Sequence, residues 1–282
     1  MALSRSFIVL TGLALCAAVP AAAARAPQRI VSLNLCTDQL LMALVPAQRI
    51  VSITWLSRSE GDPALLPLAR RLPVNRGSAE EVLGARPDLV LAGRYTTGTT
   101  RALLRKAGVP LLDVDPVSDW EGIRRITREV AAAVGAQQRA EQLLAQMDAD
   151  LAQLARRQRQ PAVRAIGWSG AGDDVPGGDT LFNTILETAG GINLAARAAG
   201  RGSFDLEQVL RSAPQVLLRG AAYGGTPALR NDVADHRVLH ALPGLRLVAY
   251  PEAVFGCGVP HASRLALQLA EQLDQIRAAG PP

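Results

Sequence analysis

The chain has 282 residues, of which 49% are hydrophobic, and a formal net charge of +5 at pH 7. Arginine carries nearly all of the positive charge, because Lys106 is the only lysine, and the arginines are scattered among acidic residues. A nucleic-acid-binding surface needs a basic stripe, so this pattern argues against a nucleic-acid partner. The apolar content is ample for one or two cores, and we expect a monomer.

The first 24 residues are predicted to be a secretory signal peptide. A single early charge at Arg5 precedes the apolar run 7–19, and an alanine-rich tract ends at Ala24, where small residues allow cleavage. The apolar run is too short for a transmembrane helix, which needs about 20 residues. Cys16 follows a leucine where a lipoprotein signal would have a small residue, so we expect no lipid anchor. The sequence therefore predicts a mature protein that is soluble and lies outside the cytoplasm.

Short apolar runs alternate with helical patterns in the first part of the mature chain, 25–135. Such alternation predicts β–α units and a parallel sheet, and we assign this range to an N-terminal lobe. The expected strands are 29–33, 49–53, 88–92 and 110–114, and the expected helices are 37–44 and 100–107.

Helical spacing of apolar residues then continues over 32 residues, from Ile123 to Leu154, with Gly135 between them. A helix of that length usually acts as a strut, and the arginines before Pro161 suit a helix C-terminus. We therefore predict a spine helix over 136–159 that joins two lobes.

The alternation resumes over 160–282, which we assign to a C-terminal lobe. Its expected strands are 163–168, 215–218 and 246–249, and its expected helices are 180–189, 205–211 and 262–278. The predicted fold class is therefore α/β, with two Rossmann-like lobes whose parallel-rich sheets are bridged by a single long α-helix.

An internal repeat supports the expectation of two similar lobes. Both copies describe a short helix that opens with a glutamate, a proline stop, and a buried strand that ends in glycine. The residues Glu80, Val82, Leu83, Pro87, Leu91 and Gly93 recur 127 positions later as Glu207, Val209, Leu210, Pro214, Leu218 and Gly220.

Candidate ligand-binding residues follow the predicted strands. Ligands of open α/β sheets bind beyond the carboxyl ends of the strands, where loops and helix N-termini converge. The residues at these positions combine aromatic rings with guanidinium groups, which suits a large, partly anionic ligand with flat apolar surfaces. The predicted set is Asn34, Cys36, Asp38, Trp55, Arg94, Tyr95, Trp168, Arg219, Phe255 and Cys257.

Three segments carry the most specific motifs of the chain. They read RIVSLNLCTDQLL at 29–41, GSAEEVLGARPDLVLAG at 77–93 and LEQVLRSAPQVLL at 206–218. These segments resemble the periplasmic binding proteins for ferric siderophores and vitamin B12. The resemblance implies two lobes on one rigid spine helix, a metal chelate bound in the cleft between them, and delivery of that chelate to the permease of an ABC importer with its cytoplasmic ATPase.

The same resemblance gives a role to Glu80 and Glu207. In that family an exposed glutamate on each lobe docks onto arginines of the permease, and paired charges of this kind set orientation more than raw affinity. Alternatively, each glutamate only complements the dipole at the start of its helix.

Cys36 and Cys257 are the cysteines that remain after signal removal, and they depart from the usual pattern of that family. In an oxidising periplasm two cysteines form a disulfide by default. Such a bond would cross-link the two lobes at the binding cleft, which is unusual for a protein that must load and release a ligand. Alternatively, both thiolates together with His261 contact a soft metal centre or its chelate, or the thiols are free. The sequence leaves these alternatives open.

Two rival functions find little support. A binder of bare Zn²⁺ or Mn²⁺ would need about three histidines with a carboxylate, and only His236, His240 and His261 exist. The segment GWSGA at 167–171 narrowly misses the G-x-S-x-G nucleophile elbow of an exported hydrolytic enzyme.

The sequence therefore predicts a solute-binding protein without a resident cofactor, and not an enzyme. A ferric siderophore or a corrinoid such as cobalamin is the expected ligand. Haem is a further candidate, because Tyr95 or Tyr223 could serve as an axial ligand to its iron.

Overall fold

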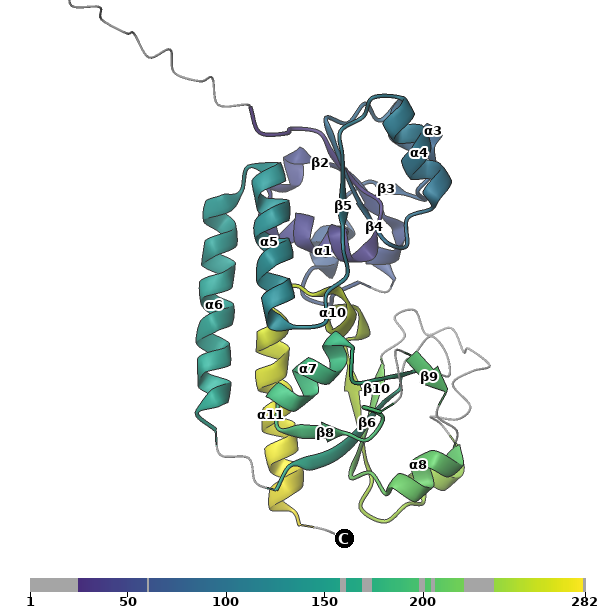
Figure 1. The fold of residues 1–282 in the computed structure, drawn as a ribbon, viewed down its shortest axis with the longest axis vertical. Coiled ribbons are helices and arrows are strands. Elements are labelled where there is room, and N and C mark those ends of the chain that lie inside the picture. Colours follow the sequence, from purple (N-terminus) through teal and green to yellow (C-terminus); the bar gives the residue numbers. More distant parts are fainter. Residues whose placement is uncertain are drawn as a thin grey trace, which may run out of the picture.

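Two α/β lobes lie one beyond the other along a long helix in the computed structural model (Figure 1). The structure describes residues 25–59, 61–157, 161–168, 174–197, 201–203, 206–220 and 236–280. The signal peptide predicted over 1–24 lies outside the described residues. In the described part of the chain, no helix combines the length and the apolarity needed to span a bilayer.

The N-terminal lobe is built on a five-stranded parallel sheet in the order β3-β2-β1-β4-β5. The strands and helices predicted for this lobe are confirmed within two residues at most ends. Its strands are β1 Ile30–Ser32, β2 Ile50–Thr54, β3 Val74–Asn75, β4 Leu89–Gly93 and β5 Leu111–Val114, and its helices are α1 Leu35–Leu44, α2 Leu66–Ala69, α3 Ala79–Gly84 and α4 Gly98–Lys106, with 3₁₀ turns at Ala47–Arg49 and Trp55–Arg58.

The C-terminal lobe contains a four-stranded parallel sheet in the order β11-β10-β6-β8 and an antiparallel pair, β7 with β9. The predicted elements are again present, whereas shorter elements of three to six residues were not predicted, because so few residues carry no clear period. Its strands are β6 Val163–Trp168, β7 Asp174–Pro176, β8 Gly191–Asn193, β9 Arg201–Ser203, β10 Val216–Gly220 and β11 Arg246–Tyr250, and its helices are α7 Leu181–Thr188, α8 Leu206–Ser212, α9 Arg237–His240, α10 Glu252–Cys257 and α11 Ala262–Ala278.

The helical run between the lobes is two helices, α5 Trp120–Val134 and α6 Gln137–Ala155. The helical spacing over 123–154 does not form one continuous helix, because Gly135 adopts the left-handed conformation (φ 66°) and ends α5. The chain then reverses, and α6 runs back beside α5 and on to the C-terminal lobe (Figure 1). The single helix that bridges the lobes is therefore α6, within the range predicted for the spine.

The internal repeat has a structural counterpart in the turns before β4 and β10. Among the described residues, Arg86 and Ala213 are the non-glycine residues with positive φ (48° and 45°), and they lie 127 positions apart. Each directly precedes the repeated proline. In each lobe an arginine side chain holds this turn: Arg29 Nε donates to the Arg86 carbonyl at 3.0 Å, and Arg164 Nη2 donates to the Ala213 carbonyl at 2.8 Å. The two lobes therefore share a strained backbone turn as well as a sequence pattern.

The main apolar core runs without a break from one lobe to the other. A single cluster of buried residues includes Leu41 of α1, Val130 of α5, Met147 of α6, Ile185 of α7 and Leu267 of α11. Smaller clusters lie in each lobe away from the junction. The lobes are therefore joined by packed side chains as well as by the spine helix.

Candidate functional site

A cavity of about 390 Å³ lies between the two lobes. Arg94, Tyr95 and residues 116–118, which follow β4 and β5, line it from the N-terminal lobe. The start of α7 and the end of β11 with α10 line it from the C-terminal lobe. Its size is that of a small-molecule binding site, and its place beyond the strand ends is the one that open α/β sheets use for ligands.

Arg94 and Tyr95 are exposed side chains of the N-terminal wall. Tyr95 is 80% exposed and Arg94 is also exposed. The buried side chain of Thr96 fixes the loop beneath them, because its Oγ1 donates to the Leu33 carbonyl at 3.1 Å and accepts from the Gly93 N–H at 3.2 Å. A cation and a phenol are thus presented to the cavity by a well-held loop.

Three aromatic rings form the opposite wall. Phe182, Tyr250 and Phe255 are each at most 5% exposed, and their ring centroids lie 5.0–5.9 Å apart in tilted pairs. Tilted rings at this spacing pack favourably and hold one another in place. The acidic residues Asp179 and Glu252 also line this side. The cavity therefore combines a rigid apolar wall with charges of both signs.

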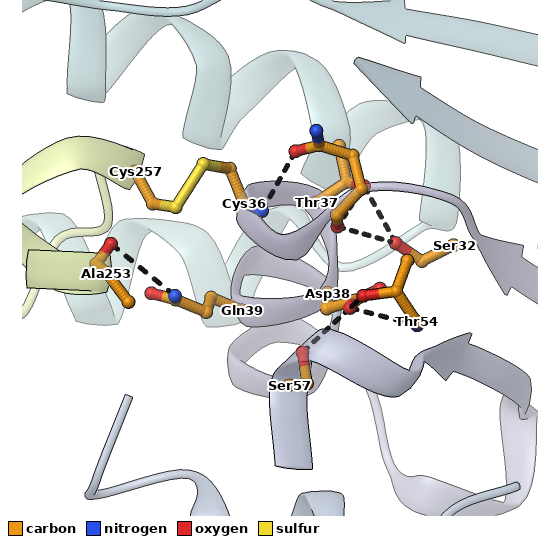
Figure 2. The surroundings of a disulfide bond; sticks show 10 residues. Ser32, Cys36, Thr37, Asp38, Gln39, Thr54, Ser57, Ala253 and Cys257 are labelled. Atoms are coloured by element: carbon orange, nitrogen blue, oxygen red, sulfur yellow. Dashed lines mark hydrogen bonds between the residues drawn. A yellow bond between two sulfur atoms is a disulfide. The ribbon is translucent and has the colours of Figure 1, made fainter. Parts of the chain in front are cut away.

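A disulfide between Cys36 and Cys257 joins the lobes next to this cavity (Figure 2). Cys36 lies in the first turn of α1, where its N–H donates to Oδ1 of Asn34 at 2.9 Å, and Cys257 ends α10. Both cysteines, with Asn34, line a second cavity of about 60 Å³. Of the alternatives that the sequence left open, the structure shows the disulfide.

The prediction of a metal site at Cys36, Cys257 and His261 is therefore wrong. The two sulfur atoms bond to each other, which removes the thiolates that a soft metal would need. The His261 imidazole is used elsewhere, because its Nε2 pairs with Oδ2 of Asp62. Within the residues that the structure describes, no group of three or more His, Cys, Asp or Glu side chains could hold a metal ion.

Asp38 is not on the cavity wall, contrary to its assignment as a ligand-binding residue. Its side chain is fully buried beneath α1, and its Oδ2 accepts hydrogen bonds from the Thr54 N–H at 3.0 Å and from the Ser57 hydroxyl at 2.7 Å (Figure 2). Burial raises the pKa of Asp38 to about 7, although these hydrogen bonds partly offset that rise. Asp38 therefore anchors α1 to the end of β2.

This pKa predicts an unusual dependence of stability on pH. Because folded Asp38 holds its proton up to about pH 7, whereas the unfolded chain loses it near pH 4, the folded state binds more protons between these values. The contribution of Asp38 to stability should therefore be greatest below pH 4 and be lost as the pH rises to 7, by as much as roughly 4 kcal/mol.

Melting temperatures of the wild type and Asp38→Asn between pH 4 and pH 8 test this expectation. The amide keeps the oxygen that accepts from Thr54 and Ser57 but does not titrate, so the difference between the two curves should grow toward neutral pH in favour of the variant. Parallel curves would show that Asp38 titrates normally in the folded protein.

Trp168 is likewise a core residue and not a cleft residue. It is 1% exposed and packs in the smaller C-terminal cluster with Ile166, Val175 and Leu217. Both faces of its strand, β6, are covered, because Val163 and Ala165 pack in the main core and Ile166 packs with Trp168 in the smaller cluster. The near-elbow motif that includes Trp168 continues into 169–171, outside the described residues.

The other predicted residues divide into two groups. Six of them border the two cavities, and their role in binding a ligand stays a prediction: Asn34, Cys36, Arg94, Tyr95, Phe255 and Cys257. Trp55 is 49% exposed in the 3₁₀ turn after β2, and Arg219 is partly buried in β10, but neither lines these cavities. Tyr223, named as a possible haem ligand, lies outside the described residues.

Phe182 and Tyr250 line the cavity but were not predicted from the sequence. Tyr250 is the last residue of β11 and could have been found by applying the strand-end argument to its neighbour Phe255. Phe182 is the second residue of α7, so only the three-dimensional arrangement of the helix brings it to the site.

Glu80 and Glu207 are exposed residues of the first turns of α3 and α8. These helices lie in the outer parts of the two lobes, on the side away from α6 (Figure 1). The capping of α3 uses the neighbouring Glu81, whose Oε2 accepts from the Arg76 N–H at 2.9 Å, while the Ser78 hydroxyl accepts from the Glu81 N–H at 3.2 Å. Glu80 therefore takes no part in that hydrogen-bonded cap.

Comparison with known proteins identifies relatives over most of the chain. A model of the periplasmic binding protein family matches residues 30–246. A cobalamin-binding protein of Halobacterium salinarum is 26% identical over 207 residues, which are 70% of this chain and 54% of the relative. The chain thus spans about half the length of that relative. YvrC of Bacillus subtilis, an uncharacterized ABC transporter substrate-binding lipoprotein, is 21% identical over 246 residues, 82% of this chain and 77% of the relative.

Solved structures share the fold described above. The periplasmic haem-binding protein RhuT from Roseiflexus sp. RS-1 superposes with a TM-score of 0.69 at 26% identity and covers 88% of this chain and 98% of its own. The vitamin B12-binding protein BtuF of Vibrio cholerae has a TM-score of 0.67 at 19% identity, with 89% and 98% covered. At that identity the second likeness concerns the fold alone.

Proposed function

Because this chain belongs to the periplasmic binding protein family, we propose that it captures a metal chelate between its lobes and delivers it to the permease of an ABC importer. The observation that carries the proposal is the 390 Å³ cavity, where the Arg94 cation and a wall of three packed aromatic rings line the same space. A chelate with anionic groups and a flat apolar framework would use both features. Binding and delivery, and not catalysis, are the proposed activity.

A ferric siderophore or a corrinoid is the proposed ligand. Haem is a second candidate, which the 80% exposure of Tyr95 at the cavity specifically favours, because a phenol can ligate haem iron. The names of the Halobacterium and Roseiflexus proteins, which bind cobalamin and haem, support the inclusion of both classes.

A thermal-shift screen of the purified protein tests the proposal. Ferric siderophores, cobalamin, cobinamide and haemin are each added at about 100 times a micromolar dissociation constant, at which a true ligand stabilises the folded state by about 2.7 kcal/mol. Quenching of tryptophan fluorescence gives an independent signal. Failure of all four classes to bind would overturn the assignment to chelate transport.

Arg94→Ala should weaken binding of an anionic ligand by roughly tenfold to a hundredfold, because a hydrogen bond to a charged group contributes about 1.5–3 kcal/mol. Arg125→Ala is the matched control, since Arg125 is an exposed arginine on α5 whose ion pair is with Glu129 and not with the cavity. Equal affinities of these two variants, measured by fluorescence titration, would remove Arg94 from the site.

We further propose that the protein is exported by a cleaved signal peptide that ends at Ala24 and works as a periplasmic monomer without a lipid anchor. N-terminal sequencing and intact mass of the protein from the producing cell would test the cleavage position. A lipid-modified Cys16 at the N-terminus would contradict it.

A further inference from the structure

The disulfide crosses the boundary between the lobes at the edge of the cleft. Cys36 and Cys257 are 221 positions apart, and they join α1 of the N-terminal lobe to α10 of the C-terminal lobe. The lobes are also connected through α6 and through the shared core, which includes Leu41 of α1 and Val254 of α10. The bond therefore closes a second, covalent connection next to the ligand cavity.

Only light polar contacts accompany this bond at the α1–α10 contact in the described residues. The Gln39 amide donates to the Ala253 carbonyl at 3.5 Å (Figure 2), and His261 pairs with Asp62 beside it. Gly258 follows Cys257 with φ 66°, and a side chain there would collide with Val117 of the other lobe, so α10 ends tightly against the β5–α5 connection. Since each neutral hydrogen bond adds little, the restraints on the distance between α1 and α10 are the covalent bond and the apolar packing of the shared core.

The two sulfur atoms border the cleft. Cys36 and Cys257 line the 60 Å³ cavity, and Arg94, Tyr95, Pro116 and Gly256 line both this cavity and the larger one. A ligand that fills the larger cavity therefore lies over the approach to the disulfide from the cleft.

We propose that the Cys36–Cys257 disulfide is a redox-controlled clamp on the ligand cleft. In the oxidised protein the bond holds α1 against α10 and preserves the cavity. Reduction by a dithiol transfers two electrons and two protons to the two cysteine sulfurs, while the dithiol becomes a disulfide, and noncovalent packing alone then holds α10 against α1, so that α10 moves away from it more often. The effect on ligand affinity rests on the proposed function, whereas the change in motion does not.

Ligand binding and oxidation must favour each other if the clamp exists. When the oxidised form binds a ligand more tightly by some factor, the ligand makes the disulfide harder to reduce by the same factor. The bound ligand also shields the sulfurs from a dithiol in the cleft, so reduction should become slower as well as less favourable.

Hydrogen exchange of the exported protein tests the clamp without any ligand. Mild reversible reduction should increase amide exchange in 35–44 and 252–257 by at least about fivefold while leaving α6 unchanged. In the second arm, cyanocobalamin affinity is compared between the oxidised wild type and Cys36→Ser/Cys257→Ser, which needs no reductant, and a loss of at least about fivefold is expected. Circular dichroism of the variant verifies its fold.

These arms separate failure of the clamp from failure of the proposed function. Unchanged exchange in α1 and α10 after complete reduction, verified by alkylation and mass, overturns the clamp whatever binds. If the oxidised protein does not bind cyanocobalamin, the corrinoid assignment is lost, and the exchange result still decides the clamp. If the double variant does not fold, the reversibly reduced wild type supplies the same comparison.

Discussion

Replacement of both Glu80 and Glu207 by alanine is expected to abolish uptake of the ligand by cells while leaving its affinity for the purified protein unchanged. Both carboxylates are exposed, in the outer parts of different lobes, and α6 with the continuous core holds their separation fixed. The Glu207 carboxylate pairs with Arg211 at 3.3 Å, but both side chains are largely exposed, so this pair is weak and easily exchanged for an arginine of the permease. Loss of both charges should therefore remove the docking orientation.

Glu81→Ala is the matched control for this experiment. Glu81 is the exposed neighbour of Glu80 and closes the N-terminal cap of α3, so its loss should cost about 1 kcal/mol of stability and leave uptake intact. Uptake of radiolabelled ligand and affinity of the purified variants are measured side by side. Normal uptake by the double variant would show that the two glutamates act only on their own helices.

Trp168→Ala is expected to destabilise the protein by about 3–5 kcal/mol. The substitution removes the largest fully buried side chain among the described residues and leaves a cavity in the core. Denaturant unfolding gives this free energy directly. Where the variant remains folded, its ligand affinity should stay near that of the wild type, since the indole packs on Ile166, Val175 and Leu217 and does not line the cavity.

Tyr95→Ala should give the opposite result. Its side chain is 80% exposed, so the stability change should stay within about 0.5 kcal/mol, while ligand affinity falls. The pair distinguishes an aromatic residue of the core from one of the site. A Trp168→Ala protein of normal stability that fails to bind ligand would restore the tryptophan to the cleft.

Much of the fold could be predicted from the sequence because its signals are local. Periodicity located the longer strands and helices, and the repeat of Glu80 to Gly93 at Glu207 to Gly220 indicated two similar lobes. The reversal of the chain at Gly135 was harder to predict, because apolar residues continue at helical spacing on both sides of it, so the pattern alone does not show that the chain turns back there.

The site was harder to predict because strand-end residues can turn either way. Asp38 and Trp168 both stand at strand ends in the sequence, yet the first turns under α1 to bind Thr54 and the second turns into the core. Arg94 and Tyr95 follow a strand in the same manner and are exposed. Packing of neighbouring elements, which a one-dimensional pattern does not contain, decides between these outcomes.

The pairing of the two cysteines could not be predicted for a different reason. Their types and compartment permitted a disulfide, but 221 positions of intervening chain carry no information on their separation. Only the contact of α1 with α10 brings them together.

The unbroken apolar core has a consequence for how the molecule loses its structure. Buried side chains of α1, α5, α6, α7 and α11 form one cluster, so unfolding of either lobe would expose apolar surface of the other. The two lobes should therefore unfold cooperatively as a single thermodynamic unit.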